Sequence, residues 1–205
     1  MLKGPFWYKT IKRAVDIGGS LLGIIALFPL FLLIALLIKL DSRGAVFFIQ
    51  ERCGRGGRGF GMFKFRTMVE NAEEMKRDLH EKNEVNGPMF KIGNDPRITR
   101  LGMFLRATKL DELPQLWNVL KGEMGLVGPR PLASDEMQGE PEWRELRLMV
   151  KPGMTGAWQV MSRDYRSFEE WVYWDTYYVK NRSFWLDIRI LFKTIFVVFK
   201  KREAY

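Results

Sequence analysis

The sequence has one cysteine and one histidine among its 205 residues. The single cysteine, Cys53, excludes a disulfide framework and any zinc site built on several cysteines. The single histidine excludes a metal site with paired histidine ligands. His80 lies in a charged stretch, VENAEEMKRDLHEKNE, which we interpret as an exposed helix. The absence of cysteine pairs is compatible with a reducing, cytoplasmic setting.

Acidic residues are also in deficit. The chain carries 33 Lys and Arg against 24 Asp and Glu, a formal net charge of +9. Such a balance favours anionic partners, which include nucleic acid, lipid headgroups and phosphorylated substrates. The phosphate-loop pattern GxxxxGK[ST] is absent. The Arg-Gly-Gly segment at 55–57 is too brief to indicate nucleic-acid binding, so we expect no nucleic-acid partner.

Charge is missing altogether from the 22 residues Ile17–Ile38. About 20 apolar residues suffice to cross a hydrocarbon core of about 30 Å. Both flanks are basic, however, so the distribution of positive charge favours neither orientation. Pro29 lies in the middle of the run, where it removes a helical hydrogen bond and favours a break. The residues leave two paths open, a kinked spanning helix and a re-entrant helix that leaves on the side it entered.

A chain of 205 residues has the length of one ordinary domain, or of one domain with an appendage. Strand-like runs at Ala45–Glu51 and Phe60–Met68 flank a glycine-rich segment and predict a β-hairpin. The aromatic helix predicted at Phe168–Lys180 would suit the level of the lipid headgroups. Ile190–Phe199 is too short to span a bilayer and predicts an amphipathic helix lying in the interface, with a soluble core helix as the alternative.

The most informative stretch is Leu110–Pro131, LDELPQLWNVLKGEMGLVGPRP. Adjacent carboxylates, Asp111 and Glu112, precede a helix that we expect to run from Pro114 to Lys121 and to stop at a glycine. The two prolines around Arg130 restrict the backbone and hold that arginine in one direction. A carboxylate pair facing a fixed arginine suits phosphate chemistry with a bound cation. By spacing alone, a capped helix followed by a structural turn explains the stretch equally well.

Together with KPGMTGAWQV and YYVKNRSFWLDIRIL, this stretch resembles the bacterial sugar transferases. These are monotopic phosphoglycosyl transferases, and the similarity is to the polyprenyl-phosphate hexose-1-phosphate transferases that begin capsule, exopolysaccharide and O-antigen (lipopolysaccharide) assembly. The resemblance covers essentially the whole chain. Larger members carry additional N-terminal membrane helices, and we expect this chain to correspond to the catalytic unit.

The resemblance implies a transfer of sugar-1-phosphate from a UDP-sugar to polyprenyl phosphate, usually undecaprenyl phosphate, through a covalent aspartyl intermediate. In this family pattern Asp111 matches the nucleophile and Glu112 its partner. Lys64, Arg106 and Arg130 match cations near the phosphates. Magnesium is the implied cofactor, with Asp111 as its ligand, and a hexose such as glucose or galactose is the favoured sugar.

The residues suit this chemistry. A carboxylate attacks phosphorus to give a mixed anhydride that a second phosphate can displace. Mg²⁺ binds through one or two carboxylates plus substrate oxygens, so neither histidine nor cysteine is needed. Arginine binds phosphate through two parallel hydrogen bonds. Cations are expected here because a pyrophosphate would otherwise meet two carboxylates, a repulsion of several kcal/mol at an effective dielectric of about 20.

The implied fold is α+β: a mostly helical monotopic membrane protein with a re-entrant N-terminal helix hairpin, a small β-hairpin and amphipathic interfacial helices. We divide it into residues 1–44 (membrane helix), 45–182 (catalytic domain) and 183–205 (interfacial helix). The expected location is the bacterial inner membrane, with the catalytic domain on the cytoplasmic face of the lipid bilayer. A homodimer is compatible with the sequence.

Two departures from the family pattern stand out. Phe28-Pro29 replaces a frequent Ser-Pro at the helix break, and Met161-Ser162-Arg163 replaces a common [SN]-GR after Gln159-Val160. The second departure makes this loop an unsafe guide to the donor sugar. A competing interpretation is a non-catalytic membrane-associated protein that binds anionic lipid or nucleic acid. Such a protein would tolerate Glu112→Gln and would need no Mg²⁺.

Overall fold

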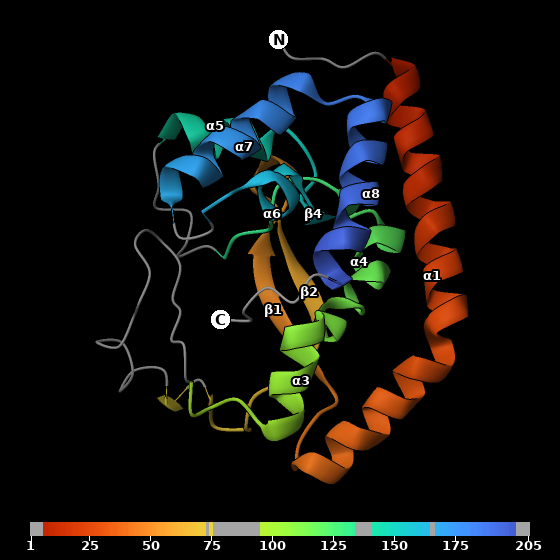
Figure 1. Cartoon of the computed structure of the whole chain (residues 1–205), viewed down its shortest axis with the longest axis vertical. Coiled ribbons are helices and arrows are strands. Elements are labelled where there is room, and N and C mark those ends of the chain that lie inside the picture. Colours follow the sequence, from red (N-terminus) through yellow and green to blue (C-terminus); the bar gives the residue numbers. More distant parts are fainter. Residues whose placement is uncertain (1–5, 73, 76–94, 134–140, 165–166, 200–205) are drawn as a thin grey trace.

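The computed structural model describes residues 6–72, 74–75, 95–133, 141–164 and 167–199. Its α-helices are α1 (Phe6–Asp41), α3 (Arg100–Thr108), α4 (Gln115–Lys121), α5 (Pro141–Leu148), α6 (Ala157–Met161), α7 (Phe168–Asn181) and α8 (Phe184–Phe199). The strands are β1 (Phe47–Cys53), β2 (Gly59–Phe65), β3 (Gly125–Val127) and β4 (Gly153–Thr155), and the 3-10 turns are η1 (Arg55–Gly57) and η3 (Leu110–Glu112). Figure 1 shows α1 running along one side of the molecule, with the remaining elements packed beside it.

Helix α1 is continuous for 36 residues and contains Pro29. Figure 1 shows its C-terminal half, in orange, leaning away from the line of its N-terminal half. Proline is a common cause of such bends, because its ring displaces the preceding turn and it has no N–H to donate. The structure therefore shows one bent helix, not two helices joined by a loop. The predicted hairpin is not confirmed, and the re-entrant path stays a prediction.

Within the described residues, α1 is the one helix long and apolar enough to cross a membrane, over Trp7–Asp41. Only 11% of its most apolar window is buried inside the protein. Leu22, Ile25 and Leu40 are 69%, 64% and 75% exposed. A contiguous apolar surface of this kind marks a contact with lipid or with another apolar partner.

The N-terminal half of α1 is anchored to the rest of the protein by polar contacts. The Arg13 guanidinium donates to the backbone carbonyls of Val119 at 2.7 Å and Leu120 at 2.8 Å. These carbonyls belong to the last turn of α4, where helical partners run out. The Asp16 carboxylate accepts the backbone N–H of Leu126 at 2.9 Å. The same helix thus contacts α4 and β3 through charged side chains and exposes its apolar side chains further along.

A second set of contacts ties the first helix to the last one. The Tyr8 hydroxyl donates to the Asp187 carboxylate at 3.0 Å, and the Tyr178 hydroxyl donates to its other oxygen at 2.8 Å. Lys12 forms an ion pair with Asp187 at 3.0 Å. These bonds connect α1, α7 and α8. The predicted division into three domains stays a prediction.

The predicted β-hairpin is confirmed. Strands β1 and β2 pair antiparallel, with Phe47 opposite Phe65 at the open end. Gly56 and Gly57 have φ of 69° and 77° in the connecting turn. Glycine adopts this left-handed region at little steric cost, which explains the run of glycines between the two strands.

A second sheet, which the sequence did not predict, joins β3 and β4 in parallel. Gly125 lies opposite Gly153, and Val127 lies opposite Thr155. A Cβ atom on Gly153 would lie 2.0 Å from the backbone nitrogen of Gly128. Gly153 therefore approaches Gly128 to a distance that only glycine permits, and the Lys-Pro-Gly-Met-Thr-Gly loop packs directly on the Gly-Pro-Arg-Pro turn.

One face of the aromatic helix α7 lies in the core. Trp171 and Tyr178 are 1% and 2% exposed, so the expectation that these aromatics lie at the headgroup level is wrong for both. Trp171 stacks on Trp158 and meets Trp143 edge-on, with ring centroids 4.8 and 5.5 Å apart. Aromatic side chains bury large apolar areas, and here they form the interior of the C-terminal half.

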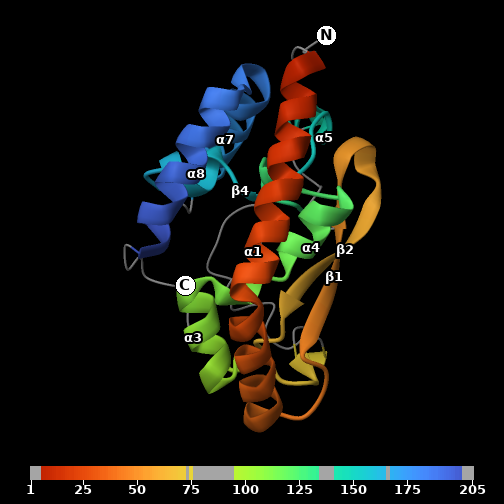
Figure 2. The same ribbon diagram turned by 90° about the vertical axis from the view of Figure 1, so that its right-hand side faces the viewer.

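Helix α8 has two apolar faces. Its inner face contributes Leu186 and Ile190 to a core cluster with Val127 and Tyr178. Figures 1 and 2 show α8 beside the N-terminal half of α1. Large side chains on its outer face are exposed: Trp185, Phe192, Ile195 and Phe196. The inner face is therefore that of a core helix, and the interfacial position of the helix stays a prediction.

Some expectations fall outside the described residues. His80 and most of the charged helix predicted from Val69 to Glu84 belong to this group, as do Gly139 and Glu140 of the predicted loop before α5.

Candidate active site

The acidic pair lies in a tight turn between α3 and α4. Helix α3 ends where Lys109 adopts φ 60°, and its backbone N–H bonds back to the carbonyls of Leu105 and Arg106. Lys109 is the one non-glycine residue with positive φ in the described part of the chain. Such a conformation costs about 1–3 kcal/mol and is concentrated at functional sites. It reverses the chain, so that Asp111 and Glu112 follow at once in η3.

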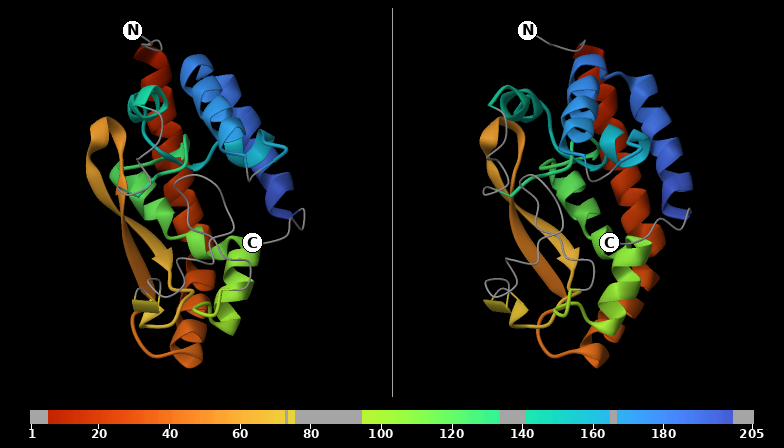
Figure 3. Two further views of the ribbon diagram at one scale, coloured as in Figure 1. Left: turned by 90° about the vertical axis from the view of Figure 1, so that its left-hand side faces the viewer. Right: turned by 60° about the vertical axis from the view of Figure 1, so that its left-hand side comes forward.

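Strand β2 brings Lys64 to the acidic pair. Its Nζ lies 3.3 Å from the Glu112 Oε1. The strand is held in place by Asn118 of α4, which is fully buried. Its side chain accepts the backbone N–H of Phe63 at 3.0 Å and donates to the carbonyl of Gly61 at 2.7 Å. One amide thus bonds the edge of β2 to the helix that follows the acidic pair, and Figure 3 shows the two elements side by side.

The charges around Glu112 keep it ionised. Burial by itself opposes ionisation, but the charges of Lys64, Arg130 and Lys109 outweigh it and lower the pKa of Glu112 to about 2. Burial lowers the pKa of Lys64, and the Glu112 charge opposes that fall. A carboxylate with several nearby cations is the arrangement that favours the charged form.

Asp111 has a different environment, although it is the next residue. It is only 7% exposed. Burial, followed by the neighbouring Glu112 charge, raises its pKa, while Lys64 and Arg106 oppose the rise. Its Oδ1 is buried and accepts no hydrogen bond from the described residues. A buried carboxylate oxygen in this state is available to a cation or to a reacting phosphorus.

Arg106 is held by Thr67, two residues after the end of β2. Its Nε donates to the Thr67 hydroxyl at 2.8 Å. Helix α3 lies so close to this segment that a Cβ atom on Gly102 would lie 2.1 Å from the Thr67 carbonyl oxygen. Burial lowers the pKa of Arg106, and the Asp111 charge opposes that fall. Because arginine stays protonated in proteins, Arg106 is a permanent positive charge beside Asp111.

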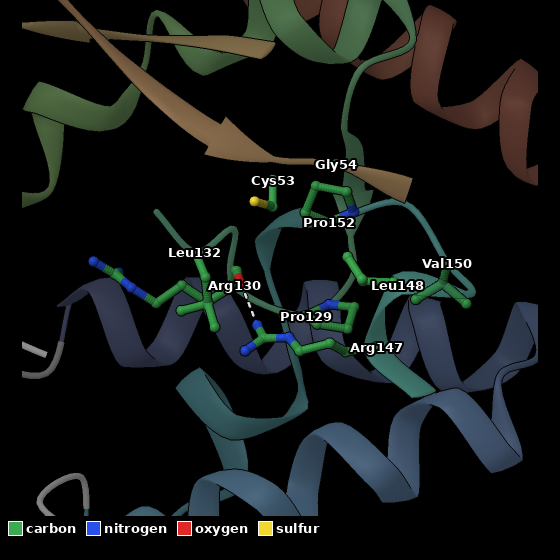
Figure 4. A pocket seen from close by; sticks show the side chains of 9 residues that line it. All are labelled: Cys53, Gly54, Pro129, Arg130, Leu132, Arg147, Leu148, Val150 and Pro152. Atoms are coloured by element: carbon green, nitrogen blue, oxygen red, sulfur yellow. Dashed lines mark hydrogen bonds between the residues drawn. The ribbon is translucent and has the colours of Figure 1, made fainter. Parts of the chain in front are cut away.

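Arg130 lies on the turn between β3 and the segment that leads to α5. In Figure 4 its side chain extends away from the turn, while its backbone carbonyl faces Arg147. A dashed line marks the hydrogen bond that the Arg147 guanidinium donates to this carbonyl. The charge of Arg130 acts on both Lys64 and Glu112. The backbone of Arg130 is therefore fixed, and its side chain carries the charge toward the acidic pair.

The structure thus gathers Lys64, Asp111 and Glu112 in one place, with Arg106 and Arg130 around them. Pro29 lies apart from these residues in the chain, within α1. The individual roles of all six residues stay predictions. Sequence reasoning missed Lys109, whose charge acts on both carboxylates. Its position two residues before Asp111 was the available signal.

These features define a site in which cations surround two carboxylates, in a protein with an exposed apolar helix. Comparison with known proteins gives the family. The chain matches the family described as "Bacterial sugar transferase" over residues 7–201. It belongs to that family.

Three curated relatives illustrate the similarity. The UDP-galactose-lipid carrier transferase of Erwinia amylovora is 47% identical over 201 residues, which cover 96% of this chain and 42% of the relative. The undecaprenyl-phosphate galactose phosphotransferase of Salmonella typhimurium is 44% identical, with the same coverage. The exopolysaccharide production protein ExoY of Rhizobium meliloti is 40% identical over 95% of this chain and 88% of its own length. The chain therefore spans less than half of the first two relatives and most of the third.

Proposed function

We propose that this protein transfers a sugar-1-phosphate from a UDP-sugar to polyprenyl phosphate, giving polyprenyl-diphospho-sugar and UMP. The reaction would be the first membrane step of exopolysaccharide, capsule or O-antigen synthesis. One observation carries the proposal: a buried aspartate with an available oxygen lies beside an ionised glutamate and is surrounded by cations. The names of the relatives from Erwinia amylovora and Salmonella typhimurium support it.

The reaction proceeds in two displacements at one phosphorus. First, a carboxylate oxygen of Asp111 attacks the phosphorus attached to the sugar. The bond from this phosphorus to the bridging oxygen breaks, and UMP leaves with that oxygen. Second, a phosphate oxygen of polyprenyl phosphate attacks the same phosphorus, and the Asp111 carboxylate is released. The raised pKa of Asp111 makes its ionised form more basic, which favours attack.

The cations have a separate task. Charge accumulates on the non-bridging oxygens and on the leaving phosphate during transfer, and preorganised positive groups stabilise it. Arg106 and Arg130 can each present two N–H groups to a phosphate, whereas Lys64 acts as a point charge. Glu112 holds Lys64 through the 3.3 Å ion pair and keeps it in the site.

Magnesium fits this site. The described residues contain no group of three or more His, Cys, Asp or Glu that could hold a metal ion by themselves. A Mg²⁺ ion would therefore take Asp111, whose Oδ1 is available, together with phosphate oxygens of the substrate. When bound, the ion would neutralise phosphate charge and ease departure of UMP.

The membrane path proposed for α1 is re-entrant, with the catalytic domain at the cytoplasmic face of the bacterial inner membrane. The bend in the helix that contains Pro29, its exposed apolar surface and the exposed outer face of α8 support it. Leu116 of α4 approaches within 3.1 Å of the place where a Cβ of Gly23 would lie. The helix that follows the acidic pair thus touches α1, so a lipid phosphate at the interface would arrive close to Asp111.

The function is tested by assaying UMP release with the purified full chain in lipid nanodiscs, with Mg²⁺, undecaprenyl phosphate and a panel of UDP-sugars. We expect one sugar to support turnover, Asp111→Asn to abolish it and EDTA to stop it. Glu51→Gln, which removes an exposed carboxylate from β1, is the matched control and should retain activity. Turnover by Asp111→Asn close to that of the wild type would exclude Asp111 as the nucleophile.

The membrane path is tested by labelling single cysteines in whole cells. In a Cys53→Ser background, Lys9→Cys and Arg43→Cys place one thiol near each end of α1. The re-entrant path predicts that a membrane-impermeant reagent labels neither until the cells are opened. Labelling of one position alone from outside would establish a spanning helix.

A further inference from the structure

The turn that carries Arg130 is held through its carbonyl groups. Its two prolines have no backbone N–H to donate. The carbonyls of Pro129 and Leu132 accept backbone N–H groups from Gly153 at 2.9 Å and Cys53 at 2.7 Å. Between them, the carbonyl of Arg130 accepts from Arg147. The remaining carbonyl of the turn, that of Pro131, also accepts a hydrogen bond, so all four carbonyls from Pro129 to Leu132 are bonded.

That contact comes from Arg52 of β1, whose guanidinium donates to the carbonyl of Pro131 at 3.3 Å. Arg52 and Arg147 are 5% and 6% exposed. Arginine is almost never buried to this extent without a partner, so we expect each side chain to have hydrogen-bond partners in the protein interior. One partner of each is a backbone carbonyl next to the Arg130 side chain.

Each of the two arginines is itself held in place. Arg52 donates to the amide oxygen of Gln50 at 2.6 and 3.2 Å. Arg147 forms an ion pair with Asp175 at 3.3 Å. The guanidinium of Arg147 also lies over the ring of Trp143, 4.5 Å from its centroid, which adds a cation–π interaction. The donors therefore have little freedom to follow the turn if it moves.

We propose that Arg52 and Arg147 are positioning residues for Arg130. Their hydrogen bonds fix the carbonyl of Arg130 itself and the carbonyl of Pro131, the next residue. Figure 4 shows the Arg130 side chain extending away from that fixed backbone. This inference rests on the proposed function, in which Arg130 binds a phosphate of the substrate. Neither positioning residue needs to touch the substrate. Their effect on the reaction passes through Arg130.

A purely structural role makes a different prediction, and a double-mutant cycle separates the two. If Arg52 acts through Arg130, its removal lowers kcat/KM only when the Arg130 side chain is present. If Arg52 simply stabilises the fold, its removal has the same effect in both backgrounds. The variants are Arg52→Gln and Arg147→Lys, each alone and combined with Arg130→Ala. Arg144→Gln removes a different arginine of α5 as the control.

We expect Arg52→Gln and Arg147→Lys to lower kcat/KM for the UDP-sugar about 10- to 100-fold, the scale of a small misplacement of a substrate-binding group. In the Arg130→Ala background each should change it less than twofold, and Arg144→Gln should leave the wild-type value unchanged. Arg52→Gln keeps the test valid if Arg147→Lys does not fold, because it leaves the buried pair of Arg147 and Asp175 intact. If the wild type is active and each substitution lowers kcat/KM equally with and without the Arg130 side chain, the positioning role is overturned and the proposed function stands. A wild type that releases no UMP would overturn the proposed function as well.

Discussion

Two carboxylate–cation pairs flank Arg130, and both have the same separation. Lys64 lies 3.3 Å from Glu112, and Arg147 lies 3.3 Å from Asp175. The side chains of the first pair are 17% and 26% exposed, and those of the second are 4% and 3% exposed. The pKa values of their carboxylates nevertheless shift in opposite directions. The pKa of Glu112 falls to about 2, whereas burial raises the pKa of Asp175 to about 6 against the opposing charge of Arg147.

The difference shows that the surroundings of an ion pair decide its properties more than its contact distance. Glu112 also faces the charges of Arg130 and Lys109, which outweigh its burial. Asp175 lies among tryptophans, where desolvation dominates. The first pair is therefore suited to remain charged beside a phosphate. The second is suited to hold Arg147, and through it the turn, in one place.

The largest effect is expected from breaking the first pair. Glu112→Gln removes the charge that holds Lys64 but keeps a side chain of similar shape. We expect UMP release to fall about 10²- to 10³-fold, the range typical of losing one preorganised electrostatic contact. Thermal unfolding in detergent should stay close to that of the wild type. Near-normal activity would instead favour the non-catalytic alternative.

Breaking the second pair should affect stability first. Arg147→Met leaves Asp175 as an uncompensated buried charge, and we expect the free energy of unfolding to fall by about 3–5 kcal/mol. Denaturant titration in detergent measures it. Adding Asp175→Leu to the same protein removes the stranded charge and should restore most of the loss. Failure of the second substitution to restore stability would contradict the assignment of the pair.

The raised pKa of Asp175 gives a third prediction, with a defined sign. Between pH 4 and pH 6 the folded state keeps a proton on Asp175 that the unfolded state has lost, so stability falls as the pH rises. The pKa difference from 3.8 to about 6 corresponds to about 3 kcal/mol at 1.36 kcal/mol per unit. Asp175→Asn should remove this slope. Parallel stability curves for the two proteins across that range would show that Asp175 has an ordinary pKa.

The smallest effect is expected from removing the hydrogen bond between Thr67 and Arg106, next to the first pair. Thr67→Val removes the hydroxyl that accepts from Arg106 at 2.8 Å and leaves a buried donor without that bond. We expect a loss of about 1–3 kcal/mol in stability and only a few-fold loss in kcat/KM. Thr67→Ser retains the hydroxyl and should behave like the wild type. A larger loss of activity in Thr67→Ser than in Thr67→Val would contradict this role.

Local patterns in the sequence predicted local structure well. The glycine-rich segment between two apolar runs predicted the β-hairpin, and Gly122 ends α4 with φ 89°, at the residue where the helix was expected to stop. The neighbourhood of Lys64 and the acidic pair followed from the family resemblance.

Contacts between distant segments could not be predicted in the same way. Strands β3 and β4 are three residues each, which is too short to show a pattern of their own. The close approach of Gly153 to Gly128 is likewise visible only in the structure. In the sequence, Arg147 looks like one more surface charge of α5. In the structure, its guanidinium lies over the rings of Trp143 and Trp171. The same holds for Trp171 and Tyr178 of α7, which suited a membrane interface by composition but lie in the core.

The central claim is that Asp111 carries the phosphosugar between the two substrates. It is tested most directly by mixing the full chain with Mg²⁺ and the UDP-sugar in the absence of polyprenyl phosphate, quenching, and measuring the intact mass and the modified peptide by mass spectrometry. We predict a mass increase of one phosphosugar that maps to Asp111, is lost on adding undecaprenyl phosphate and is absent from Asp111→Asn. A phosphosugar mapped to any other residue, or turnover with no adduct under conditions that trap acyl phosphates, would contradict it.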